Sequence, residues 1–185
     1  DMLTLSSDRA STYLSSANVW NMLLPDSAKN VVSTLRAVGM GGYVDKVEGS
    51  MNQGAALAAQ EAKPIFAAAV RDMTVVDALG IWKGGDSAAT QYFRSKTEAA
   101  LRAKFQPIVQ SSLKKTGYFN QYQTLISAYN AIPLTSKPNL DLETYVMNKT
   151  LDGMFAKMAS EETLIRKNPA QRGTAAIQGI LGAIK

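Results

Sequence analysis

Residues 141–167 read DLETYVMNKTLDGMFAKMASEETLIRK, and this stretch decides the fold class. Apolar side chains recur along it at steps of three and four residues, which places them on one face of an α-helix. Asp141 is a residue type that caps helix starts, and Asn168-Pro169 ends the pattern because the residue before a proline disfavours the helical conformation. The stretch therefore predicts a helix over 141–167.

The same spacing occurs along most of the remaining chain, whereas the period-two alternation of strands is hard to find. The sequence therefore predicts an all-α protein, a compact helical bundle of about seven to eight helices with no significant sheet. Gly39 suits the left-handed position after a helix end, and Pro64 suits the first position of a new helix. Among the expected helices are 8–15, 43–62, a new one from Pro64 to 73, 74–83, 86–105 continuing past Pro107 to 116, 118–131 and 170–184.

The chain shows no internal repeat, linker or low-complexity tract, so we expect residues 1–185 to form a single domain. A chain of 185 residues that is 46% hydrophobic can bury roughly 70% of its unfolded surface. No run approaches the roughly 18 apolar residues of a membrane helix, and no membrane span is expected. The chain starts at Asp1 without a methionine, so we expect that any export signal has been removed.

Cysteine and histidine are both absent. This absence excludes Cys and His nucleophiles, imidazole and thiolate metal sites, a haem held by a proximal His, and disulfides. We predict no cofactor and no metal ion. Any chemistry would depend on Asp, Glu, Lys, Arg, Tyr, Ser, Thr and Asn.

Residues 94–115 hold six basic and one acidic side chain, and the rest of the chain is balanced, so this segment carries the entire net charge of +5. Such a segment attracts nucleic acid or anionic lipid headgroups. However, Arg102 and Lys104 lie about 200° apart around a helix, so the charges do not form one stripe. We interpret the segment as an ordinary solvated surface and predict no nucleic-acid binding. Its basic residues are Arg94, Lys96, Arg102, Lys104, Lys114 and Lys115.

Glu162 lies on the apolar stripe of 141–167, in line with Phe155 and Met158. A buried carboxylate without a partner is costly, so we expect Glu162 to pair with Arg166, one turn further on, or with Arg94. Two interpretations stay open. Glu162 is either half of a structural ion pair or a group that contacts a ligand or acts as an acid or base with a raised pKa.

Gly84-Gly85 precedes a predicted helix start, where backbone N–H groups can bind an anion. Asp86 would satisfy those donors itself and repel an anion, so we expect Asp86 to be the cap. Thr90 and Arg94 lie one turn apart on the same face of this helix. The glycine-rich segment Gly39-Met40-Gly41-Gly42 lacks the preceding strand and the following Lys-Ser/Thr of a phosphate loop, and we interpret it as a linker.

Four ordered motifs occur along the chain: SMN at 50–52 with AKPIF at 62–66, GDSAATQYFR at 85–94, LDGMF at 151–155, and EE at 161–162 with IRKNPAQR at 165–172. Together they resemble the bacterial domain-of-unknown-function family 4197. The resemblance covers residues 23–180 and leaves 1–22 as a divergent N-terminal segment. It implies a mostly helical fold and an exported protein of the periplasm or envelope, with a lipoprotein leader as one possibility, but no activity.

The polar motif positions form our predicted ligand-binding or structural cluster: Asn52, Asp86, Thr90, Tyr92, Arg94, Asp152, Glu162, Arg166 and Arg172. We carry two functional hypotheses. The first is a non-enzymatic module that binds an unknown protein or small molecule in the envelope, with peripheral or lipid-anchored attachment to the membrane open. The second is a carboxylate-dependent, hydrolase-like enzyme using Glu162 and Asp152, with or without Mg²⁺ or Ca²⁺. The second is weaker because these two carboxylates lie about 80° apart around the helix.

Overall fold

Six α-helices and two short 3₁₀ helices make up the described part of the computed structural model, which contains no strand. The all-α prediction is confirmed, with six helices where about seven to eight were expected. The expected helix 170–184 lies outside the described residues, as does almost all of 74–83. The described residues are 2–73, 81, 83–133, 135–136, 138–168 and 173. The helices are α1 (Met2–Leu14), α2 (Lys29–Ala37), α3 (Gly41–Asp72), α5 (Ala88–Lys115), α6 (Tyr118–Asn130) and α7 (Leu142–Lys167), with η1 (Ala17–Val19) and η2 (Asp26–Ala28) between α1 and α2.

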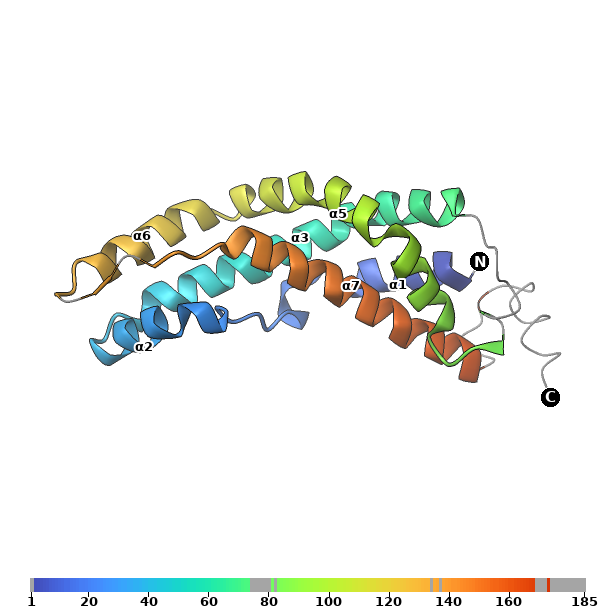
Figure 1. Cartoon of the computed structure of the whole chain (residues 1–185), viewed down its shortest axis with the longest axis horizontal. Coiled ribbons are helices and arrows are strands. Elements are labelled where there is room, and N and C mark those ends of the chain that lie inside the picture. Colours follow the sequence, from blue (N-terminus) through green and yellow to red (C-terminus); the bar gives the residue numbers. More distant parts are fainter. Residues whose placement is uncertain are drawn as a thin grey trace.

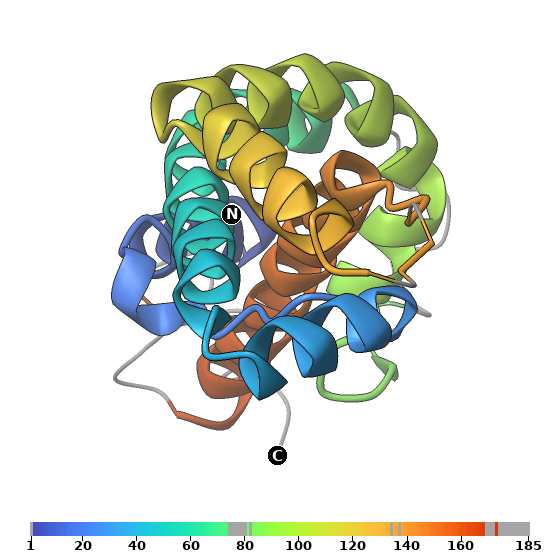
Figure 2. The same cartoon turned by 90° about the vertical axis from the view of Figure 1, so that its left-hand side faces the viewer.

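Helix α3 is the centre of the bundle, because it contacts each of the other five α-helices that the structure describes. In Figure 1 the molecule is elongated, with α2 and α6 at one end and α1 towards the other. Viewed from the end, α5 curves over the bundle (Figure 2). Pro107 lies inside α5, where a proline removes one helical hydrogen bond and favours such a bend.

Two expected helix boundaries are wrong. Pro64 does not begin a new helix, because α3 runs through it without a break. The proline is exposed, while Ala62 and Phe66 on either side of it are fully buried, so packing offsets the lost hydrogen bond. The first helix begins at residue 2 rather than 8, because its early residues Leu3 and Ser6 are buried against the bundle.

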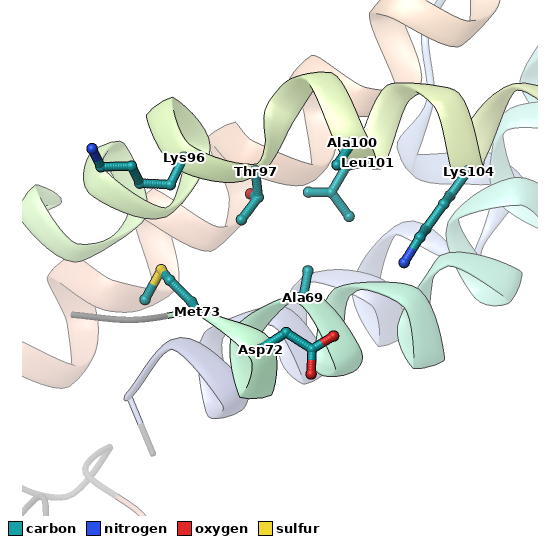
Figure 3. Close-up of a pocket in the computed structure, with 8 residues that line it drawn as sticks. All are labelled: Ala69, Asp72, Met73, Lys96, Thr97, Ala100, Leu101 and Lys104. Atoms are coloured by element: carbon teal, nitrogen blue, oxygen red, sulfur yellow. The ribbon is translucent and has the colours of Figure 1, made fainter.

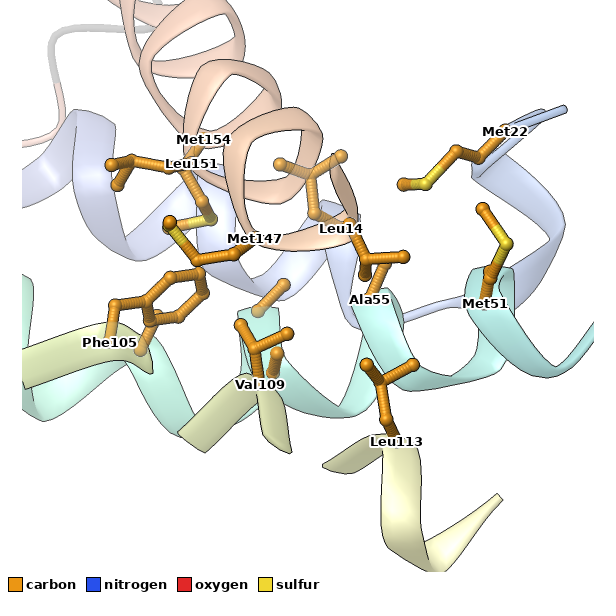
Figure 4. Packing of buried hydrophobic residues seen from close by; sticks show 14 of the residues in the cluster. Leu14, Met22, Met51, Ala55, Phe105, Val109, Leu113, Met147, Leu151 and Met154 are labelled. Atoms are coloured by element: carbon orange, nitrogen blue, oxygen red, sulfur yellow. The ribbon is translucent and has the colours of Figure 1, made fainter. Parts of the chain in front are cut away.

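Small residues on α3 allow neighbouring helices to approach closely. Ala55, Ala58, Ala59 and Ala62 are all fully buried. The Ser11 hydroxyl of α1 donates to the Ala59 carbonyl oxygen at 2.6 Å, so this approach also ties two helices together. Larger side chains from α3, α5 and α7 fill the remaining interior, including Met51, Phe105 and Leu151 (Figure 4).

Asp141 caps α7, as predicted. Its carboxylate accepts a hydrogen bond from the Thr144 backbone N–H at 3.0 Å. This bond holds the pKa of Asp141 below its usual value, because it stabilises the charged form. Gly39 has φ +78° directly after α2, which confirms the left-handed position expected there.

Candidate functional site

Glu162 of α7 is a fully buried carboxylate, and both of its oxygens are hydrogen-bonded. One carboxylate oxygen accepts the Ala89 N–H at 3.0 Å and the Arg166 Nε–H at 2.8 Å, and it lies 2.8 Å from a second guanidinium nitrogen of Arg166 in an ion pair. The other accepts the Thr90 N–H and the Thr90 hydroxyl, both at 2.7 Å. Five donors therefore surround one carboxylate.

These contacts make Glu162 the N-terminal cap of α5, supplied from another helix. Helix α5 begins at Ala88, so Ala89 and Thr90 hold the second and third N–H groups, which a capping side chain normally satisfies. Ser87, directly before the helix, makes no capping hydrogen bond through its side chain. A negative charge at this end of a helix is also stabilised by the helix dipole.

The prediction that Asp86 caps this helix is therefore wrong. Asp86 is exposed, and its carboxylate pairs with Lys167 at the end of α7. Its carbonyl oxygen accepts a hydrogen bond from the Thr163 hydroxyl at 3.3 Å. Asp86 thus links the segment before α5 to α7 at the surface of the protein, while Glu162 occupies the N-terminal cap position of α5.

Of the two partners predicted for Glu162, Arg166 forms the ion pair, and Arg94 pairs elsewhere. The Arg166 guanidinium also donates to the Ile81 carbonyl oxygen at 3.1 Å, so it fixes part of the segment that precedes α5. The Arg166 side chain is 10% exposed and that of Glu162 is 0% exposed. The Glu162–Arg166 pair is therefore buried.

Arg94 belongs to a separate charged seam between α5 and α7. Its guanidinium binds both oxygens of Glu98, at 2.8 and 3.1 Å, and one oxygen of Asp152 at 2.5 Å. It also lies 4.9 Å from the centre of the Phe155 ring. Arg102 extends the seam by binding Glu98 and Asn148. The hydrogen bond from Arg94 lowers the pKa of Glu98 and is the main reason that the pKa of Arg94 is raised.

Asn52 on α3 holds the extended segment that follows η1. Its side-chain amide accepts the Met22 N–H at 2.8 Å and donates to the Met22 carbonyl at 3.1 Å. Glu48, one turn earlier on α3, accepts the Leu24 N–H at 2.9 Å. Asn52 therefore makes a structural contact with a segment that contains none of the other motif residues.

The predicted polar cluster is thus not a single site. Thr90, Glu162 and Arg166 meet at the start of α5, whereas Arg94 and Asp152 meet at the seam. Tyr92 is half-buried beside Lys96, whose ammonium lies 5.6 Å from the Tyr92 ring centre. Arg172 lies outside the described residues.

Sequence reasoning missed a groove of about 310 Å³ between the end of α3 and the middle of α5 (Figure 3). Three charged side chains border it: Asp72 from α3, and Lys96 and Lys104 from α5. Between them lie Ala69, Met73, Thr97, Ala100 and Leu101. One signal was present in the sequence, because Thr97, Ala100, Leu101 and Lys104 follow helical spacing, but nothing indicated which helix would face them.

A second hollow, of about 260 Å³, lies between α5 and the start of α7. Gln106 and Gln110 line it from α5, and Asp141 and Glu143 line it from α7. The Gln110 amide lies 3.4 Å from a Glu143 oxygen, and Asp141 is already the cap of α7. Among the described residues, no three acidic side chains gather in an arrangement able to hold a metal ion.

Within the described part of the chain, no helix has the length and apolar character needed to cross a membrane. The fold is thus an all-helical bundle in which a buried carboxylate caps a neighbouring helix. The chain belongs to the family described as protein of unknown function (DUF4197), whose model matches residues 3–182. No curated protein and no solved structure matches it.

Proposed function

We propose that this protein is a non-enzymatic ligand-binding module that takes a small, partly apolar molecule into the groove between α3 and α5. The observation that carries the proposal is that the groove has the features of a small-molecule site, whereas the motif residues make structural contacts. The groove has apolar walls and charged side chains at its border, as small-molecule sites commonly do, and its volume is at the lower end of their range. The motif residues are instead engaged in structural contacts: Glu162 and Arg94 join α5 to α7, and Asn52 holds the extended segment at Met22.

The contacts of the two candidate catalytic carboxylates favour this proposal over the enzymatic alternative. Glu162 has no exposed surface, accepts four hydrogen bonds and forms an ion pair with Arg166, so a substrate would have to displace structural donors. Asp152 is exposed and pairs with Arg94. The two carboxylates are ten residues apart on one helix, about 15 Å along its axis, which is farther than paired carboxylates in glycoside hydrolases.

The location of the protein belongs to the same proposal. The resemblance of its motifs to an exported family supports the periplasm or envelope. Fractionation of cells that express the complete gene tests it, with recovery in the periplasmic or membrane fraction as the expected result. Recovery only in the cytoplasmic fraction would contradict it.

The groove is tested by filling it. Ala100 lines the groove and is exposed, so Ala100→Leu adds volume there without disturbing the core. Ala99 is its matched control, because it is also exposed on α5 but does not line the groove. We expect decanoate to shift the methyl NMR signals of Met73, Ala69 and Leu101 in the wild type and in Ala99→Leu.

Ala100→Leu should lose these shifts while its melting temperature stays close to that of Ala99→Leu. Two outcomes would contradict the proposal. One is that no probe shifts the groove methyl signals of the wild type, and the other is that Ala100→Leu binds decanoate as well as Ala99→Leu does.

A further inference from the structure

We propose that the α3–α5 groove selects a single-chain amphiphile with an anionic head, such as a carboxylate, and that Lys96 and Lys104 provide this selectivity. The inference rests on the proposed function and specifies its ligand class. It is carried by the distribution of ion pairs along α5, by the charges at the border of the groove, and by the groove's size.

Helix α5 contains most of the basic segment, and its charges are compensated on one side only. Arg94 and Arg102 point to the seam with α7, where Glu98 and Asp152 neutralise them. Lys115 pairs with Glu61 of α3. In contrast, Lys96 and Lys104 form no ion pair within the described part of the chain, and both border the groove. Lys114 also forms no ion pair among the described residues but lies outside the groove, so two of the three unpaired lysines of α5 lie where a ligand would sit.

Asp72 is the one carboxylate among the described groove residues, and it lies on the opposite wall. Figure 3 shows Asp72 on α3, with Lys96 and Lys104 on α5 at the two ends of the opening. Two ammonium groups and one carboxylate leave the groove with a net positive charge. An anionic head on the α5 side can meet a lysine while staying apart from Asp72, whereas a cationic head gains only Asp72 and is repelled by both lysines.

The rest of the groove suits an apolar chain. Ala69, Met73, Ala100 and Leu101 line it, and the four-carbon stems of the lysines add apolar surface while their ammonium groups stay in water. A volume of about 310 Å³ is small among ligand sites, which favours one short chain over the two chains of a bilayer lipid. Chain burial would supply affinity, and the lysines would supply selectivity.

The test compares three probes that share a ten-carbon chain: decanoate, decanol and decyltrimethylammonium, each below its aggregation concentration. Dissociation constants come from the groove methyl shifts. We expect decanoate to bind about tenfold more tightly than decanol, because the two exposed lysines together attract the anionic head, and we expect the cation to bind most weakly.

The variants separate charge from fold. In the double variant Lys96→Gln, Lys104→Gln, the dissociation constant of decanoate should become close to that of decanol. Lys114 is on the same helix but outside the groove, so Lys114→Gln should leave both dissociation constants unchanged. Asp72→Asn should tighten decanoate binding, because it removes the opposing carboxylate. Decanol binding to all four proteins reports that the groove itself is intact.

Equal affinity of the wild type for decanoate and decanol, with groove methyl shifts from both, would overturn the anion selectivity and leave the groove as a binding site. Tighter binding of the cation would overturn it as well. If none of the probes shifts the groove methyls, both this inference and the proposed function fail.

Discussion

At the scale of single residues, Glu162 shows what a sequence pattern can and cannot predict. A carboxylate in line with Phe155 and Met158 is anomalous, so its burial and its pairing with Arg166 one turn away could be predicted from helical spacing alone. The larger part of its role could not be predicted, because Ala89 and Thr90 lie more than seventy positions away in the chain. Only the packing of α7 against the start of α5 brings them to Glu162.

Removal of the charge on Glu162 should therefore be severe. In Glu162→Gln an NH₂ group replaces one acceptor oxygen, so at least one donor loses its partner and the buried Arg166 loses its counter-charge. We expect the free energy of unfolding to fall by about 3 to 5 kcal/mol, as measured by chemical denaturation.

Glu61→Gln is the matched control. Glu61 also forms an ion pair, with Lys115, but both side chains of this pair are exposed. That change should cost about 0 to 1 kcal/mol. A Glu162→Gln protein as stable as Glu61→Gln would show that the cap contributes little to the fold.

At the scale of elements, the helices could be predicted from apolar spacing, but their ends could not wherever tertiary contacts decide them. Pro64 would end many helices, yet α3 continues because Ala62 and Phe66 pack on both sides of it. Asp86 has the right residue type and position for a cap, yet Glu162 takes that place from another helix. Asp141, by contrast, is a purely local cap, and the sequence predicted it correctly.

Two glycines inside helices should respond oppositely to alanine. A Cβ atom at Gly153 of α7 would lie 2.8 Å from an atom of the Trp20 ring, whereas a Cβ at Gly49 of α3 would meet nothing within 4 Å. Trp20 cannot withdraw freely, because its indole N–H donates to the Leu14 carbonyl at 2.8 Å.

Gly49→Ala should stabilise the protein by about 1 kcal/mol through helix propensity. Gly153→Ala gains the same propensity but should lose about 1 to 3 kcal/mol to overpacking, so it should be the less stable of the two in thermal and chemical unfolding. A Gly153→Ala protein at least as stable as Gly49→Ala would show that Trp20 repacks without cost.

At the scale of the whole molecule, one cluster of buried hydrophobic side chains among the described residues draws on all six α-helices. The all-α class was predictable because it requires only spacing. The groove was not predictable, since it depends on residues 69–73, at the end of α3 and directly after it, meeting residues 96–104 of α5. Lys96 and Lys104 were identified as basic residues, but the sequence contained no information on the wall they face. The one-domain organisation and the lack of nucleic-acid binding stay predictions.

The central claim is that the polar motif residues hold the helices together while the α3–α5 groove binds the ligand. The most direct test titrates Glu162→Gln with decanoate at 10 °C, where the variant is still folded, and compares its melting temperature with that of the wild type. We expect a clearly lower melting temperature and a dissociation constant within about twofold of the wild type, because the change acts through the folded population. An unchanged melting temperature together with lost decanoate binding would contradict it, because Glu162 would then belong to the binding site.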